Sequence, residues 1–231
     1  GFGTTLRYET PEEYADYIDE ALEPVKASLP GIDLDAAIDL LLAGDELDAQ
    51  ALQGLLSTPS DEAIEVDLTD LDHKVIRTRQ TIPVSAGHLV LQYPKFIPGN
   101  HADTGPIQLL SGLTVTANGQ RIEWLRDTLD PYAFHLDIPA GVTSIDVQFQ
   151  QLTQPDASNW RVLMTPAMVN LQWEKAILYP AGYFSRQIQV APSVVLPAGW
   201  KYGTALSTAS QDGDVATFAT TDLYTLIDSP I

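Results

Sequence analysis

The sequence predicts a mainly β protein, an antiparallel β-sandwich preceded by a short acidic α-helical segment. Two observations support the sandwich. From residue 63 onward apolar and polar side chains alternate with a period of two, and glycine, proline and asparagine divide the chain into about nine short runs. A third observation marks the helical segment, where apolar side chains recur at helical spacing. We therefore divide the chain into an acidic helical segment, residues 1–62, and a β-sandwich domain, residues 63–231.

The acidic helical segment contains signals for three helices. Thr10 is the expected N-cap of the first helix, with Pro11 at the first helical position and Glu13 completing a capping box. The second and third helices are expected over residues 33–44 and 45–58. Acidic residues crowd the helix starts, where the helix dipole favours them.

Turn signals order the strands of the β-sandwich domain. Asn118-Gly119 is the strongest short signal for a hairpin. Pro139-Ala140-Gly141 and Asp212-Gly213 mark two further turns. The expected strands cover residues 63–68, 74–84, 88–94, 113–125 (as a hairpin), 133–139, 144–152, 171–180, 186–196, 200–206 and 215–227.

Composition excludes several partners and chemistries. The formal net charge is −19, with 15 acidic and 2 basic side chains in residues 1–62 and 16 and 10 in residues 63–231. Nucleic acid and anionic membrane surfaces require clustered lysine and arginine, so neither is an expected partner. The chain has no cysteine, which excludes disulfides and a cysteine nucleophile. No signal peptide is recognisable at the first residues, and we expect an exported or periplasmic location rather than a cytoplasmic one.

The histidines form no recognisable catalytic motif. No H-E-x-x-H pattern occurs, and no two histidines have the i, i+4 spacing of a helical metal site. We assign His88 and His135 to strands and His73 to a turn. Asp103-Thr104-Gly105 spells the aspartic protease signature, but that chemistry requires two such loops and the sequence has one.

The stretch YPKFIPGNHADTGPI, residues 93–107, is the best candidate for a functional loop. Its three prolines bias the preceding residues toward extended backbone, and its two glycines permit sharp turns. Between them Asn100, His101 and Asp103 lie on a short arc. Stiff loops with clustered polar groups on a rigid scaffold are typical of binding sites. These three residues are therefore the predicted candidates for a substrate cleft.

This loop and four later stretches carry a family resemblance. The later stretches are GLTVTANGQRIEWLRDTLDPYAFHLDIPAG (112–141), ILYPAGY (177–183), LPAGWKYGTAL (196–206) and LYTLIDSPI (223–231). In order along residues 63–231, the five together resemble the N-terminal domain of the glycyl aminopeptidase family. These proteins are zinc metallopeptidases with a thermolysin-like catalytic domain and often a PDZ domain. The family commonly has Glu-His after the Ile-Pro-Gly of the loop, where this chain has Asn100-His101.

The resemblance implies a non-catalytic part of a zinc-dependent aminopeptidase-like enzyme. In that family the catalytic domain carries H-E-x-x-H and a downstream glutamate, and its zinc activates water. The chain ends at Ile231, where that domain would begin. We therefore expect no enzymatic activity and no cofactor in this chain, with zinc in the missing catalytic domain. The expected partners are that domain and, in the full enzyme, a peptide substrate.

Several alternatives remain open at this stage. The loop over residues 93–107 either lines the substrate cleft or acts as a plug in the domain interface. The chain could instead be a stand-alone carbohydrate- or peptide-binding module, or an interaction protein that works through its acidic helices. A binding module would use tryptophans as a platform, although we expect them to fill the core: Trp124, Trp160, Trp173 and Trp200.

Overall fold

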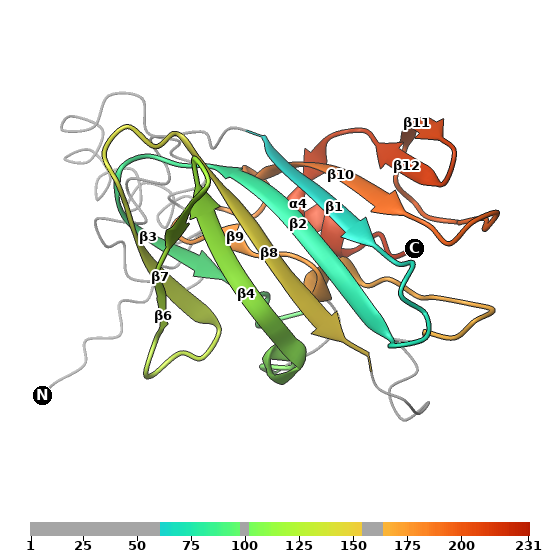
Figure 1. The fold of residues 1–231 in the computed structure, drawn as a ribbon, viewed down its shortest axis with the longest axis horizontal. Helices are drawn as coiled ribbons and strands as arrows, with labels where there is room; N and C mark the ends of the chain where they lie inside the picture. Colours follow the sequence, from blue (N-terminus) through green and yellow to red (C-terminus); the bar gives the residue numbers. More distant parts are fainter. Residues whose placement is uncertain (1–60, 98–101, 154–163) are drawn as a thin grey trace, which may run out of the picture. The chain divides into compact units, whose positions relative to one another are not determined.

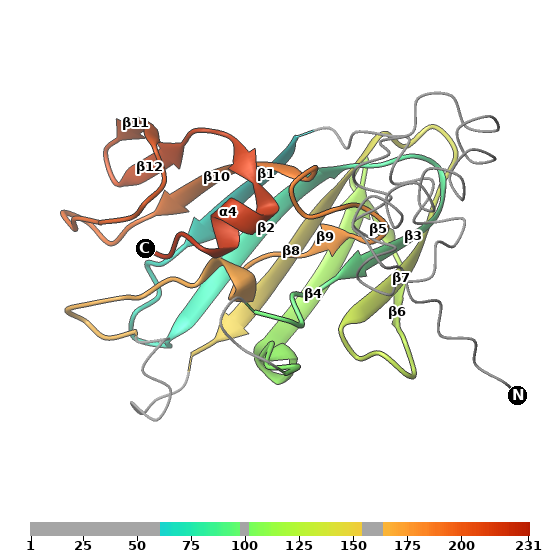
Figure 2. The same cartoon turned by 180° about the vertical axis from the view of Figure 1, so that it is seen from behind.

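The computed structural model describes residues 61–97, 102–153 and 164–231. The chain divides into two compact units, Gly1–Thr58 and Pro59–Ile231, and the second contains all the described residues. The predicted acidic helices lie outside the described residues. The second unit is mainly β, as predicted, and is built on two sheets that can be followed in Figure 1 and from behind in Figure 2.

The strands form a larger and a smaller sheet. The larger contains β1 (Glu62–Asp67), β2 (Val75–Pro83), β4 (Leu110–Ala117), β5 (Gln120–Ile122), β8 (Ser144–Leu152), β10 (Gln189–Val195), β11 (Thr208–Asp212), β12 (Val215–Phe218) and β13 (Thr221–Asp222). Its order is β11-β12-β10-β1-β2-β8-β4-β5, with β13 pairing with β10. The smaller contains β6 (Trp124–Arg126), β7 (Ala133–Ile138), β3 (Gly87–Gln92) and β9 (Tyr179–Pro180), in that order. Three short helical turns are η1 (Ile107–Leu109), η2 (Trp173–Lys175) and α4 (Leu223–Ile227).

The predicted turns are present. Ala117 of β4 pairs with Gln120 of β5, and Asn118 and Gly119 between them have φ values of 50° and 75°. Two consecutive positive φ angles are what a two-residue hairpin turn of type I′ requires. Gly213, with φ of 58°, likewise turns β11 into β12.

Two clusters of buried side chains hold the unit together. One joins β1 and β10 to η2 and α4, with Trp173 fully buried at its centre. The other draws on both sheets, because Ile145 and Phe149 of β8 lie in the same cluster as Phe134 and Leu136 of β7. The inner faces of the two sheets therefore pack on each other.

The expectation of a wholly antiparallel arrangement is wrong at one pair. β1 and β10 run parallel, from Glu62 beside Val190 to Asp67 beside Val195. Alternation of apolar and polar side chains is the same in both orientations. The pattern therefore cannot tell a parallel pair from an antiparallel one. Parallel neighbours need a long connection, and β1 and β10 are far enough apart in the sequence to have one.

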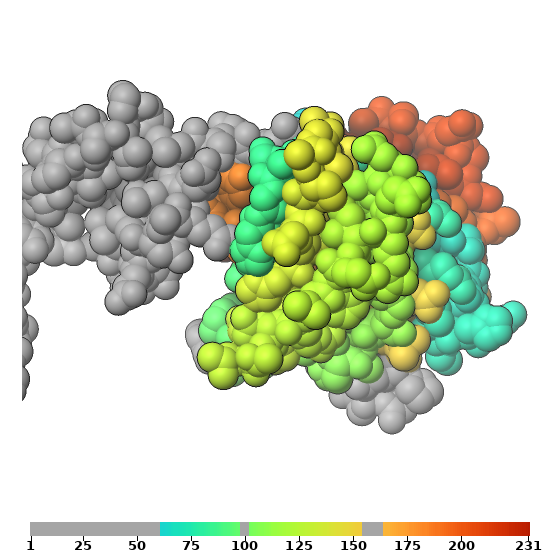
Figure 3. All heavy atoms as spheres, turned by 60° about the vertical axis from the view of Figure 1, so that its left-hand side comes forward, coloured from blue at the N-terminus to red at the C-terminus, as the bar shows by residue number. Residues whose placement is uncertain are grey.

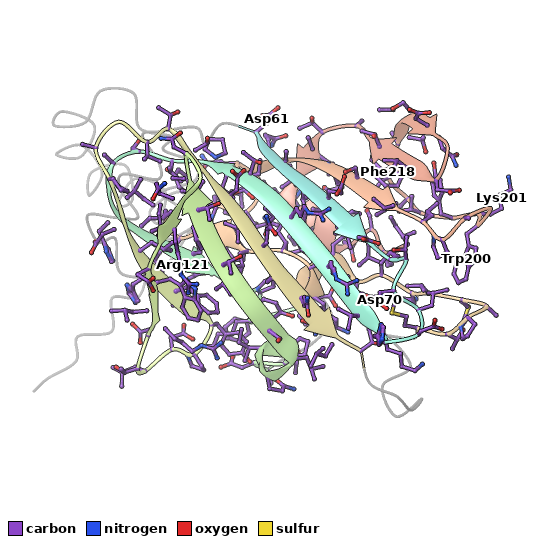
Figure 4. All side chains as sticks on the ribbon, viewed as in Figure 1. Asp61, Asp70, Arg121, Trp200, Lys201 and Phe218 are labelled. Carbon is purple, nitrogen blue, oxygen red and sulfur yellow. The ribbon has the colours of Figure 1, made fainter. Side chains whose placement is uncertain are left out.

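Three expected strands are replaced wholly or in part: β9 remains of residues 171–180, nothing of 200–206, and β12 and β13 of 215–227. Over residues 171–180 only β9 is extended, and η2 precedes it, because residues 173–178 are all buried and show no alternation. Residues 196–207 contain no strand, and Figure 4 shows Trp200 and Lys201 in the bend beyond β10. After β13 the chain turns into α4, because the Asp222 side chain accepts a hydrogen bond from the Thr225 backbone N–H and caps a helix.

Candidate functional site

The loop over residues 93–107 begins and ends in a narrow stem. Phe96 and Asp103 form an antiparallel bridge, and the backbone N–H groups of Thr104 and Gly105 both donate to the Lys95 carbonyl at 3.1 Å. The chain therefore doubles back on itself, so that residues 95–96 and 103–105 lie side by side and form the stem. Tyr93 ties the start of the stem to the body through its N–H, which donates to the Tyr132 carbonyl at 2.9 Å.

The Lys95 side chain holds the stem against a second loop. Its Nζ lies 3.4 Å from Asp103 Oδ2 and 3.7 Å from Asp130 Oδ1, and over the rings of Phe96 and Tyr132. Desolvation lowers the pKa of Lys95, but the hydrogen bond to Asp103 and the charge of Asp130 outweigh it and raise that pKa overall. The ammonium group thus stays charged and joins the two loops.

Gly105 lies where the stem is most crowded. A Cβ atom at this position would lie 2.0 Å from the Pro94 carbonyl oxygen and 2.9 Å from a ring carbon of Tyr132. The Tyr132 hydroxyl also donates to the Gly105 carbonyl at 2.9 Å. The glycine is therefore required for close approach of the two loops.

The second loop, residues 127–132, is organised by its own aspartates. Asp127 Oδ1 accepts hydrogen bonds from the backbone N–H groups of Leu129 and Asp130, at 2.7 and 2.9 Å. These two bonds, followed by the contact with His135, lower the pKa of Asp127 to about 2. Asp130 in turn accepts from the Tyr132 N–H at 3.1 Å, which leaves its carboxylate beside Lys95.

Of the three predicted site residues, only Asp103 lies among the described residues. Asp103 lies in the stem, half exposed and paired with Lys95, so the structure assigns it a bracing contact. Asn100 and His101 lie outside the described residues. Sequence reasoning missed Lys95 and Asp130, although the Asp130-Pro131 dipeptide is itself a turn signal that could have marked the second loop.

The remaining histidines lie where the sequence placed them, but two of them meet. His88 of β3 and His135 of β7 approach to 3.1 Å between ring nitrogens. His73 lies in the turn after β1 and contacts Asp70 at 2.6 Å. Figure 4 shows Asp70 and Asp61 at opposite ends of β1. In the described parts of the chain no group of three or more His, Cys, Asp or Glu could hold a metal ion.

Among the described residues, neither Trp124 and Trp173 nor a hollow on the larger sheet offers a ligand platform. Trp173 is buried, and Trp124 packs edge-on against Phe134 and donates its indole N–H to the Leu113 carbonyl. A shallow hollow of about 340 Å³ lies on the outer face of the larger sheet. Four of its polar side chains pair with one another, Arg79 with Glu65 and Thr81 with Asp146. No helix of the described residues is long and apolar enough to cross a membrane.

Fold and site together define a mainly β module in which a braced stem packs against residues 127–132. The family model for the peptidase M61 N-terminal domain matches residues 63–231, so the chain belongs to that family. The resemblance to the N-terminal domain of glycyl aminopeptidase-like zinc metallopeptidases is thereby confirmed. A search of curated proteins finds no match.

One solved structure shares the fold at low sequence identity, and two others are weaker matches. An aminopeptidase N family protein from Idiomarina loihiensis matches with a TM-score of 0.62 and 19% identity, over 73% of this chain and 28% of that protein. An M1 zinc metallopeptidase from Deinococcus radiodurans matches at a TM-score of 0.37 and 13% identity, over 71% of this chain and 38% of its own. Yeast LTA4 hydrolase matches with a TM-score of 0.39 and 12% identity, over 70% of this chain and 26% of that protein. The last two similarities are too weak to support conclusions. The chain spans 28% of the first protein's length.

Proposed function

We propose that this chain is the non-catalytic N-terminal β-sandwich module of a zinc-dependent aminopeptidase-like enzyme. In this proposal the module packs against a downstream catalytic domain, which binds the zinc, and helps shape the cleft for a peptide substrate. The family match over residues 63–231 and the fold shared with an aminopeptidase N family protein support the assignment. An exported or periplasmic location is part of the same proposal.

The observation that carries the cleft role is the braced stem. Lys95, Asp103 and Gly105 hold the stem in one position against residues 127–132, through an ion pair, backbone hydrogen bonds and close packing. In the sequence Asn100 and His101 lie between the two halves of this stem, and the proposal is that a fixed stem positions them. Precise positioning of a substrate contributes to rate even without contact with the bond that breaks.

The test uses the full-length enzyme. His101→Ala should lower kcat/KM at least several-fold, and Asp103→Ala should do the same by loosening the stem. The free energy of unfolding should change by about 0.5 kcal/mol or less for His101→Ala, as is usual for surface loops. Asp72→Ala, an exposed carboxylate in the turn after β1, is the matched control and should leave both quantities unchanged.

The alternatives predict different results. A loop that only plugs the domain interface would lower the thermal midpoint of the assembled enzyme while preserving activity per folded molecule. If both variants keep the kinetics and the stability of the unmodified enzyme, the loop has no role in its function. A stand-alone binding module is not favoured, because the described tryptophans, Trp124, Trp173 and Trp200, pack in or against the two core clusters.

A further inference from the structure

Two histidines and two aspartates form a continuous row on the outer face of the smaller sheet. In the β3–β7 ladder His88 pairs with Asp137 and Val90 pairs with His135, so the two histidines are diagonal neighbours on one face. Phe134 and Leu136, which alternate with them, point into the core. The strand order of this sheet is β6-β7-β3-β9, and the teal residues of β3 can be followed by colour in Figure 3.

Each imidazole has one nitrogen directed at a carboxylate and one at the other ring. His135 Nε2 lies 2.8 Å from Asp127 Oδ2, and His88 Nδ1 lies 3.3 Å from Asp137 Oδ1. The inner nitrogens, His88 Nε2 and His135 Nδ1, are 3.1 Å apart. Two neutral rings that both donate to their carboxylates present two lone pairs to each other. In this tautomer a cation between the inner nitrogens would accept both lone pairs, whereas in the other tautomer of His88 its Nε2–H donates a hydrogen bond to His135 Nδ1.

We propose that His88 and His135 bind one divalent transition-metal ion of the class that favours imidazole, such as Zn²⁺, with water completing the coordination. Two imidazole nitrogens bound at about 2.0–2.1 Å, at angles between square and tetrahedral, lie roughly 2.9–3.4 Å apart. The observed 3.1 Å falls within this interval.

The carboxylates occupy the positions that support such a site. A histidine that binds a metal almost always donates its other ring N–H to a carboxylate, a carbonyl or water, which fixes the tautomer and orients the ring. Asp127 and Asp137 are placed for this role on His135 and His88. Because they hold the outer nitrogens, the protein supplies two ligands, consistent with the lack of a three-ligand group among the described residues.

Access and charge also suit a cation. The His88 side chain is 55% exposed and that of His135 is 33% exposed, so an ion and its water ligands can enter from solvent. The rings are 22° from parallel with centroids 5.2 Å apart, so the 3.1 Å and 3.3 Å distances describe the ion-free pair, and a small turn of His88 about its Cβ–Cγ bond brings both lone pairs toward one ion. The exposed His88 side chain has room to do so. Bound in this way, the ion would join β3 to β7.

The experiment is a titration of the untagged 231-residue chain with zinc chloride, followed by calorimetry at neutral pH. We expect one equivalent of Zn²⁺ to bind at this pair. His88→Ala and His135→Ala should each abolish that equivalent, and Asp127→Asn should weaken it roughly 10- to 100-fold. His73→Ala is the matched control, because His73 also contacts an aspartate, Asp70, but pairs with no second imidazole.

Imidazole NMR signals of the unmodified chain, recorded during the same titration, identify the ligands even where a variant folds poorly. Shifts confined to His88 and His135, with the equivalent retained in His73→Ala, support the site. An equivalent that persists in both His88→Ala and His135→Ala would overturn it. Absence of binding to the unmodified chain would equally overturn it and would leave a shared proton as the occupant.

Discussion

Gly105 shows how a single missing side chain decides the position of the candidate loop. Its Cβ would lie 2.0 Å from the Pro94 carbonyl oxygen, a backbone atom that cannot rotate away. Gly203 provides the contrast, because no heavy atom lies within 4 Å of the position where its Cβ would be built.

We predict that Gly105→Ala destabilises the protein by about 1–3 kcal/mol, the usual cost of overpacking. Gly203→Ala, made in parallel, should change stability by less than about 0.5 kcal/mol. Urea unfolding of both variants measures the difference. Equal stabilities of the two variants would show that the stem does not pack as described.

Glu62 is a buried acid at the start of β1. It is 1% exposed, and neither carboxylate oxygen has a hydrogen-bond partner among the described residues. Burial raises its pKa from 4.5 to about 8. Between these two values the folded chain keeps a proton that the unfolded chain has lost, so the free energy of unfolding falls as pH rises.

We predict that this loss amounts to at most about 1.4 kcal/mol per pH unit between pH 4.5 and 8. Glu62→Gln should remove this contribution and make the variant more stable than the unmodified protein at pH 8. Glu123→Gln changes a carboxylate that is 81% exposed and serves as the control. Denaturant midpoints measured across this pH range test the prediction. A slope unaltered by Glu62→Gln would contradict it.

At the scale of elements, α4 is a helix of five residues that depends on its cap. Asp222 Oδ1 accepts from the Thr225 N–H at 2.9 Å and Oδ2 accepts from the Thr225 hydroxyl at 2.7 Å. The helix buries Leu223 and Leu226 against the first core cluster. Loss of the cap therefore loosens the packing at the end of the described chain.

We predict that Asp222→Ala lowers the free energy of unfolding by about 1 kcal/mol. Asp222→Asn keeps a side-chain oxygen acceptor and should retain most of the stability. Chemical denaturation of the two variants distinguishes capping from simple loss of charge. If the alanine and asparagine variants are equally destabilised, the cap is not the cause.

At the scale of the whole molecule, the acidic segment is expected to depend on the β unit. A segment of about 60 residues rarely builds a core that is stable by itself, because segments below about 70–80 residues bury too little apolar surface. The chain divides at Thr58 and Pro59, which gives the boundary for a truncation.

We predict that residues 59–231 alone fold but unfold at a lower temperature than the full chain. The reason is that a segment too short for a stable core of its own adds stability only together with the rest of the chain. Calorimetric midpoints of the two chains at equal concentration test this. Identical midpoints would mean that the segment does not dock on the β unit.

The sequence by itself determined the β class, the Asn118-Gly119 hairpin and the family, because these depend on local alternation, turn chemistry and the order of motifs along the chain. Tertiary structure decided the parallel pairing of β1 with β10. It also decided the replacement of a strand by η2, because a run of uniformly buried residues shows no alternation from which a strand or a helix could be predicted. It also decided the meeting of His88 with His135 and of Lys95 with Asp130. These contacts join residues 35–47 positions apart, and only the packing of strands and loops brings such residues together.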